Sequence, residues 1–189
     1  MVDLLTVSKE RKEAIERLAR EFRAGRSVVL STHINADGDG CGSEAALARI
    51  LKSMGMTVKI VNPTPWPETY EFLLDSDVID ASAQGAAALK AADLLIVLDI
   101  SDVKRLGSLA DTVRSLRIPK LVIDHHFASD EPPGSEIFSD TAACATGELI
   151  YDLAVTLGQE ITPQIAVALY VAVLHLLLPL LLSRDKRFF

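Results

Sequence analysis

A short stretch between His33 and Ser43, H-I-N-A-D-G-D-G-C-G-S, places an imidazole and two carboxylates close together in the sequence. It follows an apolar run at 27–32, which is typical of a buried strand, and precedes a helical pattern that begins near Ser43. The glycines leave the backbone free to fold the side chains of His33, Asp37 and Asp39 toward one point. Nitrogen and oxygen ligands of this kind suit manganese, magnesium or zinc. The alternative is a polar turn whose aspartates only cap the following helix.

Two later strands also end on titratable residues. The run at 94–99 (LLIVLD) ends on a carboxylate, and the run at 120–124 (KLVID) leads directly into His125 and His126. The carboxyl ends of parallel strands meet at one edge of a sheet, so groups far apart in the sequence can converge there. Carboxylates in such a cluster would repel each other without cations between them. The sequence therefore predicts a metal-binding cluster, with scattered surface acids as the alternative; its members are His33, Asp37, Asp39, Asp99, Asp124, His125 and His126.

The order of strands and helices predicts an α/β fold, a three-layer sandwich with a mostly parallel sheet flanked by helices. The 189 residues suffice for one domain with a sizeable core. Strands are expected at 27–32, 57–61, 94–99, 120–124 and 136–138, and helices at 8–23, 44–54, 86–91, 108–116, 146–157 and from 163 onward. An extended, proline-rich loop is expected at 62–67.

Composition narrows the function classes. The formal net charge of −7 argues against a protein that binds duplex DNA by neutralising many phosphates. Two cysteines outside any C-x-x-C pair give no disulfide framework, and the N-terminal segment does not resemble a signal peptide, so a cytoplasmic location is expected.

The apolar segment at 165–182 permits two interpretations. A membrane span is the weaker one, because the first half reads as a core helix and Pro179 should end helical continuity. The stronger one is a domain-core helix followed by a leucine-rich tail at 175–189. An exposed tail of this kind favours association, so a homodimer is possible.

Three of these motifs together resemble the first motifs of the DHH phosphoesterases: H-x-N-x-D-x-D-x-x-G-S, an isolated Asp at a strand end, and the triplet D-H-H. With T-G-E-L-I-Y after the triplet, the chain is most similar to the bacterial branch that degrades short oligoribonucleotides and dephosphorylates 3′-phosphoadenosine 5′-phosphate. The resemblance covers 27–173, and Ala36 replaces a proline common in the first motif.

Membership of this family implies a site for two manganese ions. By the resemblance, His33 and Asp37 hold one ion, Asp39 and His125 hold the other, and Asp99 bridges both. Paired cations of this kind generate hydroxide, orient the phosphorus for in-line attack and offset charge on the leaving oxygen.

The resemblance also implies roles for residues around the ions. Asp124 orients its neighbours, and His126 contacts the phosphate or assists proton transfer. Asn35, Gly42 and Ser43 are expected to contact phosphate or support the turn, since a helix beginning near Ser43 would offer free amides to an anion. Thr146 and Gly147 open another helix near the site, which ordinary capping explains equally well.

The chain departs from the family after 168–174 (ALYVAVL). The fourth motif, T-D-T-G-x-F, would supply one more Asp to the second metal, and the chain instead continues from His175 into a leucine-rich segment. Residues 1–174 are therefore expected to form an incomplete DHH domain without the second, substrate-binding domain. His175 lies close to the position of the missing Asp and could replace it, although a satisfied or solvent-facing ring is the stronger expectation.

The leading hypothesis is a manganese-dependent phosphoesterase that acts on short oligonucleotides or nucleoside 3′,5′-bisphosphates. One alternative keeps the metals but uses pyrophosphate or a cyclic dinucleotide as substrate. Another is a catalytically incomplete remnant that binds metal or nucleotide. A dinucleotide-binding oxidoreductase is weaker still, because Gly38, Gly40 and Gly42 do not match G-x-G-x-x-G and Asn62 stands where an acidic ribose ligand would be.

Overall fold

A parallel sheet forms the middle layer of the fold. The computed structural model describes residues 6–182, with side chains up to 175. The sheet has five strands in the order β2-β1-β3-β4-β5, and every pairing is parallel. The strands are β1 (Ser27–Ser31), β2 (Thr57–Ile60), β3 (Leu94–Leu98), β4 (Lys120–Asp124) and β5 (Glu136–Ser139).

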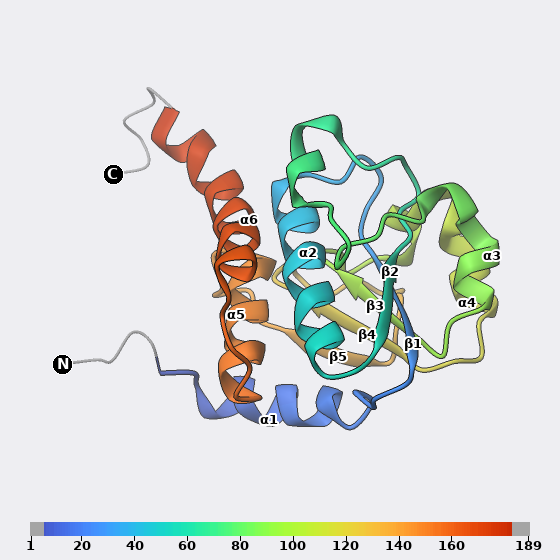
Figure 1. The fold of residues 1–189 in the computed structure, drawn as a ribbon, viewed down its shortest axis with the longest axis horizontal. Helices are drawn as coiled ribbons and strands as arrows, with labels where there is room; N and C mark the ends of the chain where they lie inside the picture. Colours follow the sequence, from blue (N-terminus) through green and yellow to red (C-terminus); the bar gives the residue numbers. More distant parts are fainter. Residues whose placement is uncertain (1–5, 183–189) are drawn as a thin grey trace.

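Helices cover both faces of this sheet (Figure 1). One face carries α1 (Lys9–Ala19), α2 (Gly38–Ser53), α5 (Thr146–Thr156) and α6 (Pro163–Leu182). The opposite face carries α3 (Gly85–Lys90) and α4 (Ala110–Ser115), together with the 3-10 segment Val103–Leu109. A second 3-10 segment, Glu68–Leu73, follows the predicted proline-rich loop. The three-layer α/β sandwich expected from the sequence is confirmed.

The central position of strand β3, covered on both faces, explains why its sequence is continuously apolar. Leu94, Ile96 and Leu98 face the core under α1, α2, α5 and α6. Leu95 and Val97 face the core under α3 and α4. Successive side chains of a strand point to opposite faces, so a strand covered on both sides needs apolar residues at every position.

Helix α2 begins earlier than the sequence indicated. It starts at Gly38, whereas the prediction placed the start near Ser43. Asp37 is its N-cap: its backbone is extended, and Oδ1 accepts the amide protons of Asp39 and Gly40 at 3.0 and 3.2 Å. A capping carboxylate satisfies otherwise unpaired first-turn amides and stabilises the start of the helix even where glycines follow. Capping and a place in the polar cluster are therefore compatible roles for Asp37.

Helix α6 continues past the expected end of the core helix. It runs through Pro179 to Leu182, so the prediction that helical continuity stops at Pro179 is wrong. A proline inside a helix removes one amide donor and crowds the preceding turn, but the leucines on both sides in the sequence favour a helix. Within the described part of the chain, the structure contains no helix that is both long and apolar enough to cross a membrane. Residues 183–189 of the predicted tail lie outside the described residues.

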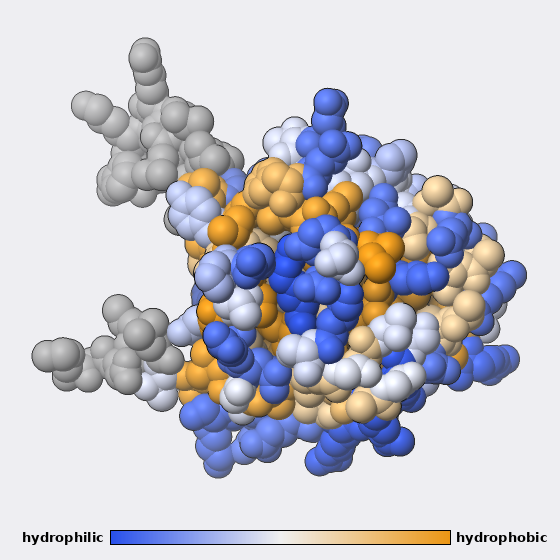
Figure 2. All heavy atoms as spheres, viewed as in Figure 1, coloured by the Kyte–Doolittle hydropathy of each residue, from blue (hydrophilic) through white to orange (hydrophobic). Residues whose placement is uncertain are grey.

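Helices α2 and α6 pack at unusually close range. A Cβ added to Gly42 would lie 2.4 Å from the carbonyl oxygen of Ala168 and 2.8 Å from the amide nitrogen of Ala172, both on α6. Only glycine permits this backbone approach. The face of the molecule that Figure 2 shows, which crosses all three layers, is hydrophilic at its centre, with hydrophobic residues beside this centre. Val167 and Tyr170 are among the exposed apolar side chains of α6.

Candidate metal centre

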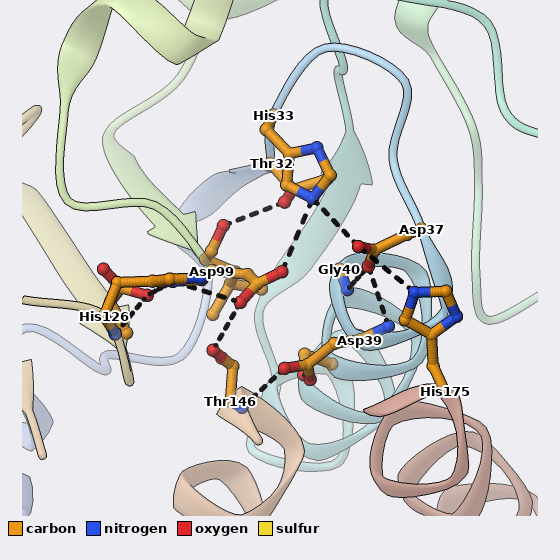
Figure 3. Close-up of polar contacts among 12 residues, drawn as sticks. Thr32, His33, Asp37, Asp39, Gly40, Asp99, His126, Thr146 and His175 are labelled. Atoms are coloured by element: carbon orange, nitrogen blue, oxygen red, sulfur yellow. Dashed lines mark hydrogen bonds and ion pairs between the residues drawn. The ribbon is translucent and has the colours of Figure 1, made fainter. Parts of the chain in front are cut away.

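The candidate site lies where the chain reverses direction across the sheet. After β1 the chain moves outward to β2 and then crosses back to β3, and ligands of open α/β sheets bind at the carboxyl ends of strands at such a point. His33 follows β1, Asp99 follows β3, and Asp124 ends β4. The side chains of His33 and Asp99 turn toward those of Asp37 and Asp39 at the start of α2 (Figure 3).

The first potential metal group consists of His33, Asp37 and Asp99. One ligand atom from each lies within 4.8 Å of the other two. His33 Nε2 is 3.7 Å from Asp37 Oδ2 and 3.5 Å from Asp99 Oδ2. His33 Nδ1 faces the carbonyl oxygen of Ile34 at 2.9 Å, which favours the tautomer with the proton on Nδ1. That tautomer leaves the lone pair of Nε2 directed at the carboxylates, as a metal ligand requires.

The second potential group shares Asp99 with the first. It joins Asp99 to His125 and His126, again within 4.8 Å. His125 Nε2 lies 3.6 Å from Asp99 Oδ1 and 3.6 Å from Asp39 Oδ2. His125 Nδ1 faces the carbonyl oxygen of Ala143 at 3.3 Å, so this ring also turns its Nε2 into the cluster.

Asp99 has an unusual backbone conformation. Its φ of 60° lies in the left-handed region, which only Asn, Asp and Gly enter readily. Its amide donates to the carbonyl oxygen of Ile123 at 3.0 Å, and its Oδ1 accepts the hydroxyl proton of Thr146 at 3.0 Å. These contacts hold a 3 % exposed carboxylate between the two groups. Strained, over-determined positions of this kind are common at functional sites.

Asp39 binds the beginning of α5. Its Oδ2 accepts the amide proton of Thr146 at 2.8 Å, and its Oδ1 accepts that of Gly147 at 3.0 Å. The hydroxyl of Ser43 donates to the same Oδ1 at 3.1 Å. Ala145, the N-cap of α5, makes no side-chain cap hydrogen bond, so Asp39 serves as the cap from a distant part of the chain.

This long-range cap was missed by the sequence interpretation, which placed Thr146 and Gly147 at a helix start near the site and held that ordinary capping explained them equally well. One signal could have suggested it: an Ala in the N-cap position leaves first-turn amides without a local acceptor.

Burial and neighbouring charges shift several pKa values in the cluster. Burial disfavours the charged ring of His33, but Asp37 and Asp99 outweigh it and raise the pKa of His33 to about 10. Burial likewise opposes ionisation of Asp37, but His33 and the Gly40 amide lower the pKa of this carboxyl below its ordinary range. For Asp39, burial and then the charge of Asp99 raise the pKa to about 7, against the effect of the α5 amides.

Asp124 and His126 form a pair beside the cluster. Asp124 Oδ1 lies 2.7 Å from His126 Nδ1 and accepts the His126 amide proton at 3.2 Å. This contact raises the pKa of His126 despite partial burial. The His126 side chain is 42 % exposed, whereas Asp124 is buried and its Oδ2 has no hydrogen-bond partner among the described residues. The geometry therefore leaves His126 accessible while Asp124 fixes its orientation.

The three residues expected at the phosphate lie in different environments. Asn35 is exposed on the loop after β1 and has a φ of 56°. Its backbone amide donates to Thr64 Oγ1 at 2.9 Å. Gly42 and Ser43 are buried inside α2, whose start at Gly38 places their amides within the helix. The expectation of free amides at Ser43 is wrong for this reason. Gly42 faces α6, and the Ser43 hydroxyl holds Asp39.

His175 reaches the cluster from α6. Its Nε2 lies 3.4 Å from Asp37 Oδ2, and its Nδ1 lies 3.4 Å from the hydroxyl of Tyr70. The ring is about one-third exposed, with 35 % of its surface accessible. The structure thus gives His175 polar partners in the cluster rather than solvent alone.

The donor set fits divalent cations. Two imidazole Nε2 atoms and the carboxylates of Asp37, Asp39 and Asp99 converge, and hard or borderline ions such as Mn²⁺ accept this mixture. The charge of Asp99 disfavours the charged form of Asp39, and a cation between the two carboxylates would offset that repulsion. Both histidines are held through Nδ1 by backbone carbonyls, the usual support for imidazole ligands.

Comparison with known proteins agrees with the geometry. The DHH family, N-terminal domain, matches residues 27–173. The chain belongs to the DHH family. The family expected from the three motifs is thereby confirmed, and the match spans β1 to the middle of α6.

Curated relatives of this DHH protein are longer than the chain. The bifunctional oligoribonuclease and PAP phosphatase NrnA of Bacillus subtilis is 30 % identical over 138 residues, which are 72 % of this chain and 40 % of that protein. The single-stranded-DNA-specific exonuclease RecJ of Escherichia coli is 29 % identical over 127 residues, 66 % of this chain and 20 % of that protein. The chain thus spans less than half the length of either relative.

Solved structures share the fold of this DHH protein. An exopolyphosphatase-related protein from Bacteroides fragilis superposes with a TM-score of 0.80 at 22 % identity, covering 94 % of this chain and 54 % of that one. RecJ in complex with Mn²⁺ from Thermus thermophilus gives a TM-score of 0.53 at 18 % identity, covering 87 % of this chain and 24 % of that one.

Proposed function

We propose that this DHH protein is a manganese-dependent phosphoesterase that hydrolyses short oligonucleotides or nucleoside 3′,5′-bisphosphates. The observation that supports this most directly is the position of Asp99, whose two carboxylate oxygens face the two potential metal groups. A carboxylate shared in this way can hold two cations a short distance apart, the arrangement used for in-line displacement at phosphorus.

In this proposal the first ion is held by His33, Asp37 and Asp99, and the second by Asp39, His125 and Asp99. Two bound Mn²⁺ ions would activate a water, orient the phosphorus and offset charge on the leaving oxygen. The protein keeps the ligands in place through fixed contacts: backbone carbonyls orient both histidines, and the start of α5 holds Asp39.

His126 is proposed to contact the phosphate or to move a proton at Nε2. Its Nδ1 is engaged by the buried Asp124, which fixes the ring and stabilises its protonated form. Asn35 is exposed on the loop after β1, and it is the remaining candidate for contact with substrate. Gly42 and Ser43 stay candidates for supporting the turn, through α6 and Asp39 respectively.

The substrate class rests on the names of the relatives, which describe an oligoribonuclease, a PAP phosphatase and a single-stranded-DNA exonuclease. The chain covers less than half of those proteins. We therefore propose this substrate class only for residues 1–174, taken as a phosphoesterase domain. A second candidate, a metal- or nucleotide-binding protein without turnover, is favoured by the leucine-rich sequence after His175 where the family motif supplies another Asp.

The test is hydrolysis of a ribodinucleotide and of adenosine 3′,5′-bisphosphate by the full chain, with and without Mn²⁺. Asp37→Ala serves as the blank, and Mn²⁺ binding to both proteins is measured in parallel by calorimetry. Mn²⁺-dependent turnover that disappears in the variant supports the enzyme. Mn²⁺ binding without turnover on either substrate supports the binding protein, and absence of Mn²⁺ binding rejects both the manganese-dependent enzyme and a metal-binding protein.

A further inference from the structure

We propose that His175 is a positioning residue for Asp37, clamping this carboxylate from α6 with the help of Tyr70. The inference rests on the proposed metal site. It adds to that site a supporting residue that lies outside the family motifs found in this chain.

The three residues form a continuous polar chain across three elements. His175 Nε2 is 3.4 Å from Asp37 Oδ2, and the Tyr70 hydroxyl is 3.4 Å from His175 Nδ1. Tyr70 comes from the 3-10 segment Glu68–Leu73, Asp37 is the N-cap of α2, and His175 lies on α6. Figure 3 shows His175 reaching Asp37 on the side opposite His33.

The contacts among Tyr70, His175 and Asp37 favour one tautomer of the His175 ring. A phenol hydroxyl donates to Nδ1, which leaves the ring proton on Nε2 and directs it at the carboxylate. Asp37 Oδ2 then faces the Nε2 proton of His175 across 3.4 Å, while Oδ1 accepts the backbone amide protons of Asp39 and Gly40. Both oxygens of the carboxylate are thereby held, and its rotation about the side-chain bond is restricted.

Close packing brings His175 to this position. A Cβ added to Gly38, the first residue of α2, would lie 2.7 Å from His175 Cβ and 3.0 Å from the Tyr70 hydroxyl. The absence of a side chain at Gly38 therefore provides the space that the imidazole occupies. One turn further along α2, Gly42 meets the backbone of α6 at Ala168, which sets the distance between the two helices.

His175 is better described as a support than as a fourth ligand of the first metal group. Its ring nitrogens do not join His33, Asp37 and Asp99 in a set of atoms within 4.8 Å among the described residues. Groups that hold a metal ligand from outside typically change metal affinity about 10- to 100-fold when removed.

The experiment measures Mn²⁺ affinity of the full chain by calorimetry, together with the urea midpoint of unfolding. We expect His175→Ala to weaken binding about 10-fold with an unchanged unfolding midpoint. His175→Gln retains a donor near the Nε2 position and should recover most of the affinity. Tyr70→Phe should produce a smaller loss than His175→Ala, because it removes only the group that sets the tautomer.

Tyr170→Phe is the matched control, since it removes a phenol hydroxyl from the exposed surface of α6. It should leave both measurements unchanged. Equal affinity of the wild-type and His175→Ala proteins would overturn the inference while leaving the metal site intact. Gln behaving like Ala would also overturn it, because the donor would then be irrelevant. If the wild-type chain binds no Mn²⁺, the proposed function and this inference fail together.

Discussion

The carboxylate of Asp39 caps α5 by accepting the amide proton of Thr146 at 2.8 Å, although 107 positions separate the two residues. The contact joins the first turn of α2 to the first turn of α5 and places a negative charge at the positive end of a helix dipole. The Thr146 hydroxyl reaches in the other direction, to Asp99 at 3.0 Å. One residue of α5 thus contacts two proposed metal ligands.

Thr146→Val should weaken Mn²⁺ binding while leaving α5 capped. The variant keeps the backbone amide that binds Asp39 but removes the hydroxyl that orients Asp99, so the affinity should fall about 10-fold. Thr156→Val on the same helix is the control, because the Thr156 hydroxyl is buried without a hydrogen-bond partner in the described structure. Calorimetric titration with Mn²⁺ distinguishes the two, and equal affinities would contradict the role of Thr146.

Asp99→Asn should abolish Mn²⁺ binding at both groups with little effect on the fold. Asn tolerates the positive φ of this position, whereas Asp99→Ala adds backbone strain of about 1–2 kcal/mol. Saturating Mn²⁺, at about 100 times its Kd, should stabilise the wild-type protein by about 2.7 kcal/mol and the Asn variant not at all. Thermal unfolding with and without Mn²⁺ measures this, with exposed Asp111→Asn as control. A Mn²⁺ shift that survives in Asp99→Asn would contradict the shared-ligand assignment.

Arg11 makes stability dependent on acid pH. Its guanidinium contacts Asp140, Glu148 and Asp152 at 2.6–2.7 Å. The backbone amide of Ala142, and after it Arg11, lower the pKa of Asp140. Arg11 also lowers the pKa of Glu148, although burial acts in the opposite direction. Their contribution is therefore complete above the ordinary carboxyl pKa of about 4 and lost as the pH falls through the lowered values.

Arg11→Met should lower the free energy of unfolding by about 2 kcal/mol at pH 7, between the values for exposed and buried ion pairs. The difference from wild type should shrink below about pH 4, since both proteins then lack the charged carboxylates. Urea unfolding from pH 2 to 8 measures it. Arg114→Met, which removes an exposed cation, should change stability much less at every pH. A pH-independent difference at Arg11 would argue for lost packing alone.

Gly42→Ala should destabilise the protein, opposite to the usual effect in a helix. Ala is favoured over Gly by about 1 kcal/mol in an exposed helix interior. At position 42, however, the added Cβ would lie 2.4 Å from the Ala168 carbonyl oxygen, and such overpacking costs about 1–3 kcal/mol. The sign of the change in the free energy of unfolding, measured with urea, decides between the two effects. A more stable variant would show that α6 shifts easily to make room for the added methyl group.

The sequence was sufficient for the layers of the fold and for the family. Continuous apolar runs such as 94–98 predict strands covered on both faces, and alternation with helical patterns makes the sheet parallel. Element ends were less predictable, because they depend on contacts that the local pattern does not contain. Because Asp37 caps α2, this helix begins five residues before the predicted start near Ser43. Helix α6 continues through Pro179, where the sequence predicted its end.

The residue types and their positions at strand ends already determined that His33, Asp99 and His125 would meet, since the edge of a parallel sheet collects whatever follows its strands. Tertiary structure alone decided how these groups are held. The cap that Asp39 gives to α5, the ring contact from His175 and the close packing at Gly42 join segments far apart in the chain. Such pairings depend on the distances between packed helices, which no local sequence pattern specifies.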